Sequence, residues 1–378
     1  MSKIEPINLA SFIGIWNSAW PIIAAVLLFL VMIVIHELGH FVAAKALGVR
    51  VNEFSVGFGP AIFKKQGKET LYAFRIIPFG GFCAMEGEDE ESSDSRAFCN
   101  KSAWRRFIIV AAGAIFNIIF GFIIAACIVI PQDIYASTTV SRFSDTAVSN
   151  SSGGLMIGDK ILKINGRRVS TDYEMSYNFT NIKGDITPVA VTDAVGNSAA
   201  VDTVSLEMMV VRNGEKITLK NVPFAYEETA GVRFVKLDFW VEPIEKTFLS
   251  SLSQTFKTTF SYMKIVVWSL VDLLSGKYGL SEMGGPVAVT DTLSQAAKKG
   301  MGSLLPMLCL ITINLGVFNL LPVPALDGGR LIFILAEMIF RKPIAKKYEP
   351  YVHAAGLILL LGLIGVVTIN DIIRLIKG

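Results

Sequence analysis

Long uncharged apolar runs constrain this chain more than any other feature of its sequence. A helix needs about 20 predominantly apolar residues to cross the hydrocarbon core of a bilayer. Four segments come close to or exceed that length: residues 19–47, residues 107–130, a run that begins near residue 304, and residues 354–369. Only 18% of the residues are charged, whereas an ordinary soluble domain has about 25%. We therefore expect a polytopic α-helical membrane protein with four transmembrane helices.

The segment between the second and third spans has a different composition. Residues 131–245 are polar, and turn signals such as Asn165-Gly166 and Asn213-Gly214 separate short alternating stretches. An Asn-Gly pair between alternating stretches is typical of a tight β-hairpin turn. We expect a mostly β domain at residues 131–245, inserted between membrane segments at residues 1–130 and 301–378.

The stretch that links this domain to the third span is amphipathic. Residues 247–274 are apolar on one side, but Lys257, Lys264 and Asp272 interrupt them. We interpret residues 246–300 as a linker region with an amphipathic helix that lies on the membrane or on the protein. A fifth span is the alternative.

Basic residues near the span ends predict the orientation, because cytoplasmic loops are enriched in Lys and Arg close to the membrane. Such residues flank the first-to-second and the third-to-fourth connections: Lys45, Arg50, Arg105, Arg106, Arg341, Lys342, Lys346 and Lys347. Both connections should face the cytoplasm, and residues 131–300 should lie outside. The net charge of +3 is too small to indicate nucleic acid as a partner. The cysteines show neither a disulfide framework nor the spacing of a cysteine zinc site.

The stretch His36-Glu37-Leu38-Gly39-His40 is an HExxH motif at the end of the first span. Residues four apart share a helix face, so both imidazoles can bind one zinc ion while Glu37 serves as general base. Two histidines and a carboxylate at membrane depth are costly and indicate a function. Counted from Trp20, His36 lies about 24 Å along the helix axis, in the cytoplasmic third of a layer about 30 Å thick. A hydrogen-bonded cluster that only packs helices is the alternative.

A catalytic zinc site needs a third protein ligand and one open position. His353 lies at the cytoplasmic end of the fourth span, and Glu53 follows the end of the first helix rather than continuing it. Asp327 is the better candidate, because Pro322, Pro324 and two glycines interrupt the third span beside it. Broken helices are tolerated at membrane depth only where protein or water satisfies the freed backbone groups. We predict that this break brings Asp327 to the metal.

With HExxH in the first span and an Asp-Gly-Gly motif in the third, the sequence resembles the site-2 protease family of intramembrane metalloproteases. It is most similar to the bacterial branch with an extracytoplasmic PDZ domain, since residues 153–167 look like one PDZ core. The resemblance implies a peptidase of the cytoplasmic membrane with one Zn²⁺ ion. It implies His36, His40 and Asp327 as zinc ligands and Glu37 as the catalytic base. It also implies single-pass membrane proteins as substrates, such as anti-sigma factors and remnant signal peptides, and a PDZ domain that can take a peptide ligand.

The same resemblance implies a set of residues that contact the substrate: Asn117, Asn314, Asn319, Gly57 and Gly59. The alternatives are that Asn117 only ties helices together and that Asn314 and Asn319 cap the helix break. Residues 54–82 are interpreted as a β-hairpin, which in the family dips into the membrane beside the active site. Its free edge could pair with an extended substrate; a hairpin that only caps the first span is the alternative. We interpret the acidic run at residues 86–94 as a solvated loop.

Two functions other than proteolysis fit parts of this pattern. A metal transporter has no use for Glu37 as a base. A PDZ-bearing scaffold with a structural zinc site needs a fourth ligand, for which the sequence offers no obviously placed histidine or cysteine. The leading interpretation is therefore an intramembrane endopeptidase.

Overall fold

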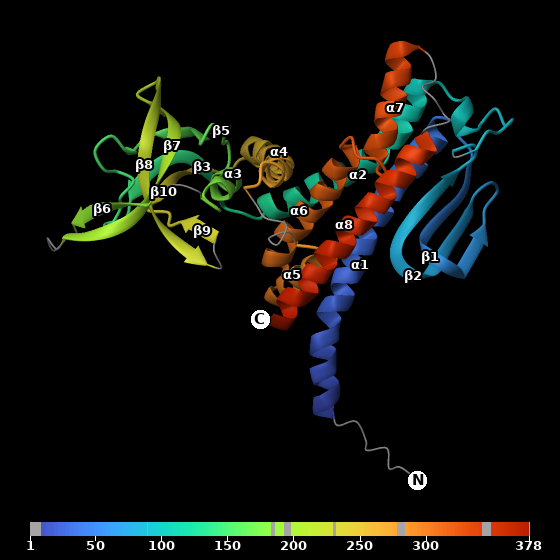
Figure 1. Ribbon diagram of the computed structural model, residues 1–378, viewed down its shortest axis with the longest axis horizontal. Helices are drawn as coiled ribbons and strands as arrows, with labels where there is room; N and C mark the ends of the chain where they lie inside the picture. Colours follow the sequence, from blue (N-terminus) through green and yellow to red (C-terminus); the bar gives the residue numbers. More distant parts are fainter. Residues whose placement is uncertain are drawn as a thin grey trace, which may run out of the picture. The chain divides into compact units, whose positions relative to one another are not determined.

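The computed structural model describes residues 9–88, 90–182, 186–192, 198–229, 232–277, 284–341 and 349–377 (Figure 1). The chain separates into two compact units, one made of Met1–Ile128 with Val266–Gly378 and the other of Val129–Ile265. The second unit extends beyond the predicted domain end at residue 245, because part of the following helix packs on it. Lys342, Lys346 and Lys347, on which the orientation partly depends, lie outside the described residues.

Four helices of the first unit are long and apolar enough to cross a membrane. They are α1 (Leu9–Ala46), α2 (Ala103–Val129), α6 (Met301–Leu320) and α8 (Glu349–Lys377). α1 is followed by Gly48 at a φ of 74°, a conformation in which glycine commonly ends helices. Each of the four predicted spans thus corresponds to a described helix that could cross a membrane.

The third span is broken as predicted. α6 ends at Leu320, and α7 (Asp327–Phe340) begins at Asp327 itself. In the turn between them Ala325 has a φ of 77°, in a region that is unfavourable for a residue with a Cβ. A Cβ at Gly328 would lie 1.8 Å from the Leu321 carbonyl oxygen, so this tight reversal requires a glycine. The break therefore places Asp327 in the first turn of a new helix.

α8 packs against this turn. A Cβ at Gly356 would lie 2.4 Å from the Pro324 Cβ, so the absence of a side chain permits the contact. The Ala325 N–H donates a hydrogen bond to His353 Nδ1 of α8 over 3.1 Å. The last helix thus holds the segment that carries Asp327.

A further helix, α5 (Pro286–Lys299), lies where the sequence indicated only a linker. Pro286 starts it, at a position where a missing N–H costs nothing. The buried Asp371 carboxylate of α8 accepts hydrogen bonds from Gly285 N over 3.2 Å and Ala288 N over 3.0 Å. α5 packs against α1, α6 and α8, so it ties the spans together.

The predicted hairpin is present and curls on itself. β1 (Val51–Gln66) pairs antiparallel with β2 (Leu71–Met85). Residues 53–56 pair with residues 81–84 on one side and with residues 71–74 on the other. The first half of β1 is therefore a central strand. Residues 81–85 of β2 form one edge of the small sheet.

The opposite edge of this sheet is the second half of β1. Residues 61–66 pair with residues 71–75. Gly57 and Gly59 have φ values of 86° and 84° where the two halves of β1 meet. Glycine adopts this backbone conformation without a steric penalty, and these two residues thus give the hairpin its curl.

The second unit is a mostly β domain. Its strands are β3 (Ile134–Phe143), β4 (Lys160–Ile164), β5 (Arg167–Arg168), β6 (Ile186–Thr192), β7 (Ser198–Arg212), β8 (Glu215–Thr229), β9 (Val232–Val235) and β10 (Phe239–Glu245). The sheet order is β10-β3-β4-β7-β8-β9, with β5 beside β4 and β6 beside β7. Asn165-Gly166 and Asn213-Gly214 all have positive φ, which confirms both predicted turns.

One short helix and the first part of a long helix belong to this unit. α3 (Asp172–Asn178) contributes Met175 to the apolar core. α4 (Phe248–Leu274) is the predicted amphipathic helix. The fully buried Glu174 carboxylate accepts hydrogen bonds from the Ser261 hydroxyl over 2.7 Å and the Lys264 ammonium over 2.6 Å. α4 is not among the four described helices that qualify as membrane spans, so the fifth span finds no support.

Candidate active site

α1 brings the two histidines of the HExxH motif to one point. The Nε2 atoms of His36 and His40 lie 3.2 Å apart, and the rings meet edge to face with centroids 4.8 Å apart. Both side chains are buried. Glu37, between them in sequence, lines the same cavity. The helical spacing thus produces the arrangement that the motif predicts.

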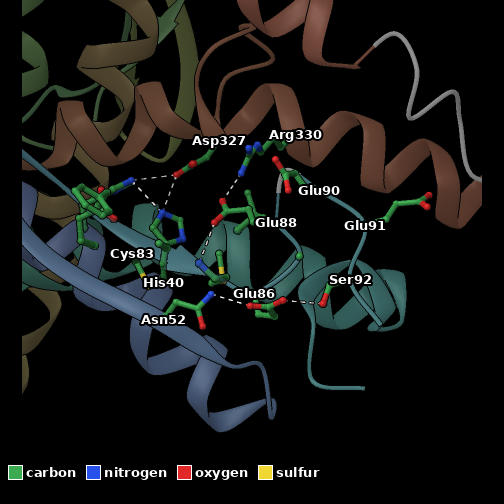
Figure 2. A pocket seen from close by; sticks show the side chains of 17 residues that line it. His40, Asn52, Cys83, Glu86, Glu88, Glu90, Glu91, Ser92, Asp327 and Arg330 are labelled. Atoms are coloured by element: carbon green, nitrogen blue, oxygen red, sulfur yellow. Dashed lines mark hydrogen bonds and ion pairs between the residues drawn. The ribbon is translucent and has the colours of Figure 1, made fainter. Parts of the chain in front are cut away.

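Asp327 reaches this point from the first turn of α7. Its Oδ2 atom lies 3.0 Å from His36 Nε2 and 3.2 Å from His40 Nε2 (Figure 2). Ligand atoms about 2.1 Å from a tetrahedral zinc ion are about 3.4 Å apart, so the three atoms fit one ion. The Asp327 Oδ2 atom is buried and makes no well-directed hydrogen bond among the described residues. A cation would satisfy it.

The backbone of α2 fixes the proton of His40. His40 Nδ1 lies 2.9 Å from the Ile109 carbonyl oxygen. A carbonyl oxygen can only accept, so Nδ1 carries the proton and Nε2 presents its lone pair to the centre of the group. Metal-binding histidines usually make an outer contact of this kind. His40 is therefore held in the tautomer that binds a metal.

Two glycines allow α1 and α2 to cross at the histidines. A Cβ at Gly39 would lie 2.4 Å from the Ala112 carbonyl oxygen. A Cβ at Gly113 would lie 2.3 Å from His40 Nε2 and 2.8 Å from His36 Cε1. Small residues allow membrane helices to approach this closely. The bare backbone of Gly113 leaves open the space beside the nitrogen atoms that would bind the ion.

The group opens onto a cavity of about 620 Å³ whose wall includes residues 82–85 of the hairpin edge. A Cβ at Gly81 would lie 3.4 Å from Glu37 Cγ, so this edge strand passes directly beside the glutamate. Strand edges offer unpaired backbone groups to an extended chain. The cavity therefore places a strand edge next to a candidate base.

The rim of the cavity is acidic. Glu86, Glu88, Glu90 and Glu91 line it (Figure 2), and Glu88 pairs with Arg330 of α7. These glutamates belong to the run that the sequence indicates as a solvated loop, and Glu90 and Glu91 are exposed as expected; the structure adds that the run lines the cavity. Sequence reasoning missed Arg330 as well, although its place three residues after Asp327 puts it on a neighbouring helical position.

The two rejected ligand candidates have other partners. Glu53 lies on β1, where its carboxylate pairs with Arg75 over 2.6 Å. His353 accepts the hydrogen bond from Ala325, in the turn before Asp327. Among the described residues, the only His, Cys, Asp and Glu side chains grouped closely enough to hold a metal are His36, His40 and Asp327.

The residues predicted to contact the substrate are distributed differently. None of the five is among the described residues that line the cavity. Asn314 is exposed on α6, whereas Asn319 is buried. Gly57 and Gly59 shape the hairpin. Asn117 is buried in α2, with its side chain against His36. A role for these five residues in substrate binding stays a prediction.

Known proteins match this sequence along nearly the whole chain. The family model described as Peptidase family M50 matches residues 24–363. A protein of Clostridium perfringens, named as a candidate zinc metalloprotease, is 35% identical over 353 residues, which cover 93% of this chain and 98% of that protein.

Two further relatives come from bacilli. The zinc metalloprotease RasP of Bacillus licheniformis is 28% identical, over 94% of this chain and 99% of that protein. The regulator of sigma-W protease RasP of Bacillus subtilis is 26% identical, over 94% of this chain and 98% of that protein. Matches of this extent, together with the four spanning helices, place the chain in peptidase family M50, the site-2 proteases, as an integral-membrane zinc metalloprotease.

Proposed function

We propose that this protein is an intramembrane endopeptidase that cleaves transmembrane segments of single-pass membrane proteins. The observation that carries the proposal is the position of Glu37. It lies in a helix long and apolar enough to span a membrane, and it adjoins a group of side chains that could hold a metal. It also faces a cavity bounded by a strand edge. A peptide bond delivered along that edge would arrive beside the base.

His36, His40 and Asp327 would hold the zinc ion, and Glu37 would be the catalytic base. When bound, the ion supplies a Lewis acid that lowers the pKa of water towards neutrality and polarises a carbonyl oxygen. Glu37 takes a proton from the attacking water and returns one to the leaving amine. Gly81 keeps the space next to the Glu37 side chain open for a peptide backbone.

The edge strand gives the substrate a reason to unwind. A helical peptide bond is shielded by its own backbone hydrogen bonds, so attack needs an extended stretch. Exposing bare backbone groups to lipid costs several kcal/mol (roughly 2–7 per group). Pairing with residues 81–85 would replace the lost hydrogen bonds, and that strand lies against the catalytic helix.

The role of Glu37 can be tested with two variants. Glu37→Gln should keep zinc but lose cleavage of a transmembrane peptide in detergent, because an amide fills the same space yet cannot take a proton. His36→Ala should lose zinc as well. Metal content and cleavage are measured on the same preparations. Near-normal turnover by Glu37→Gln would refute the base, and zinc without any cleavage in the unmodified protein would favour a transporter or a scaffold.

The role of the edge strand can be tested with proline, which removes a backbone donor. Proline at Cys83, whose N–H faces the free edge because that of Glu86 faces β1, should slow cleavage. A Leu-rich substrate span should suffer more than one containing glycine, which costs about 1 kcal/mol in a helix. Proline at Lys64, whose N–H faces outward on the opposite edge of the same sheet, is the matched control. Equal rates for both edges and both substrates would leave unwinding by this strand without support.

We also propose that the connection between α1 and α2 faces the cytoplasm and that the second unit lies outside the cytoplasmic membrane. Cys99 should react with a membrane-impermeant thiol reagent only after permeabilisation, and a cysteine introduced at Ser151 should react in intact cells. Cys83 is a poor probe: burial, with the carboxylates of Glu37 and Glu88 nearby, raises the pKa of its thiol to about 12. Labelling of Cys99 in intact cells would reverse the orientation.

The natural substrates we propose are anti-sigma factors and remnant signal peptides. The name of the Bacillus subtilis relative, a regulator of sigma-W protease, supports the first class. The β sheet and the Asn-Gly turn after residues 153–164 support a single PDZ domain in the second unit, which would take a peptide ligand. Capture of membrane proteins by the Glu37→Gln variant in cells tests the substrate class.

A further inference from the structure

His36 has a different outer contact from His40. Its Nδ1 atom faces the side-chain amide of Asn117 on α2, with Asn117 Nδ2 3.3 Å away. Asn117 is completely buried. Gly316 of α6 covers it, since a Cβ at that glycine would lie 3.3 Å from Asn117 Cβ. The amide is therefore enclosed between three helices, and it contacts a ring that would bind the metal.

The orientation of this amide decides where His36 carries its proton. A neutral imidazole has one N–H and one acceptor nitrogen. If the Asn117 nitrogen donates to Nδ1, the imidazole proton sits on Nε2 and points at Asp327 and His40, where it blocks a cation. Asn117 Oδ1 is then buried without a hydrogen-bond partner among the described residues. Rotating the amide by half a turn about its terminal bond brings Oδ1 to Nδ1 and frees the Nε2 lone pair.

We propose that Asn117 is a positioning residue of the metal centre: its Oδ1 accepts the Nδ1 proton of His36 and thereby presents Nε2 to the zinc ion. The inference rests on the proposed function, in which His36 is a ligand. It assigns Asn117 a role other than substrate contact, in keeping with its absence from the described lining of the cavity.

The amide suits this position better than the carboxylate that often makes such outer contacts. Histidine ligands donate their second ring N–H to a carboxylate, a carbonyl or water. At membrane depth each additional charge is expensive, and Asp327 already supplies one to this group. A neutral amide oxygen fixes the tautomer without a further charge. His40 obtains the same result from a backbone carbonyl, so both rings are oriented by neutral acceptors on α2.

The test compares zinc affinities of purified full-length variants in detergent, by competition with a chelator. Losing an outer contact of this kind typically weakens metal binding about 10- to 100-fold. Asn117→Leu, which keeps the volume but has no acceptor, should weaken zinc binding by that factor and alter the visible absorption of the Co²⁺-substituted protein. Asn117→Asp, which keeps an acceptor oxygen, should bind zinc much more tightly than Asn117→Leu.

Thr312→Val is the matched control. Thr312 is fully buried on α6 and its hydroxyl has no hydrogen-bond partner among the described residues, so the change removes a buried polar group that makes no hydrogen bond with His36 or Asn117. It should leave zinc affinity and the Co²⁺ spectrum unchanged. Thermal unfolding of every variant shows whether the fold is kept.

Three results would overturn the inference. Wild-type zinc affinity in Asn117→Leu with lost cleavage would assign Asn117 to the substrate. Equal weakening in Asn117→Leu and Asn117→Asp would reduce it to packing. Unchanged zinc affinity and cleavage in both would leave it no role in the site. By contrast, an unmodified protein that binds no zinc, or whose zinc survives His36→Ala, would refute the proposed function itself.

Discussion

Replacing Gly113 by alanine should weaken zinc binding while leaving the helices folded. The new Cβ would lie 2.3 Å from His40 Nε2 and 2.8 Å from His36 Cε1, whereas ordinary contacts begin at 3.4 Å. Either the helix backbone or a histidine ring must therefore move by about 1 Å. If α1 and α2 separate, the Gly39–Ala112 contact opens. If the His40 ring turns instead, it loses its hydrogen bond to Ile109 and withdraws Nε2 from the group.

Either movement displaces a proposed ligand. Overpacking of this kind costs about 1–3 kcal/mol, and 1.4 kcal/mol corresponds to tenfold in affinity. We expect zinc affinity to fall roughly 10- to 100-fold, measured by chelator competition, with unchanged helix content by circular dichroism. Gly121→Ala is the control. Gly121 is also on α2, and its new Cβ would lie 2.4 Å from Ile313 Cγ1 of α6, not beside a histidine. Gly121→Ala should lower thermal stability and keep zinc. Wild-type zinc affinity in Gly113→Ala would refute the reasoning.

Three further predictions concern the supports of the site. Asp371→Leu leaves the Gly285 and Ala288 amides at the start of α5 unpaired and should lower the free energy of unfolding by about 1–3 kcal/mol. Asp371→Asn should lower it less. Equal melting temperatures of Asp371→Leu and the unmodified protein would contradict this capping role of Asp371. Ala325→Gly removes the Cβ that makes the positive φ at this position unfavourable and should keep zinc affinity. Ala325→Val should lower zinc affinity in the chelator-competition assay. Tighter zinc binding by Ala325→Val than by Ala325→Gly would exclude strain in this turn. Hydrogen bonds from Lys45 and then Arg96 lower the pKa of Glu69 from 4.5 to about 2, so the stability it contributes is present above pH 4.5 and is lost as pH falls through about 2. Glu69→Gln should flatten that dependence in denaturation of the metal-free protein, and an unchanged slope would argue against it.

Local sequence pattern was sufficient for much of the site. The spacing of His36 and His40 on an apolar helix is a local property, and so is the break that isolates Asp327. Pro322 and Pro324 cannot continue a helix, and the glycines after Asp327 allow the reversal seen at Gly328. These rules depend on residues close in sequence, so they can be applied without knowing the fold.

The contacts that the sequence did not predict join residues distant in the chain. The Ile109 carbonyl that fixes His40 is a backbone group, and its role cannot be predicted from the type of residue 109. The pairing of Glu88 with Arg330 and the capping of α5 by Asp371 each join distant segments. Gly39 and Gly113 gave a partial signal, because small residues in two apolar helices indicate a close crossing. Which small residues face each other is decided only when the helices pack.

The three side chains that would hold the metal lie on segments that are synthesised at different times, α1 first and α7 near the end. α1 with His36 and His40 enters the membrane early, and the whole second unit is made before α7 supplies Asp327. Until then the growing chain carries two of the three side chains that would hold the ion. The group that would hold the ion is therefore complete only after α7 has been made and packed against α1.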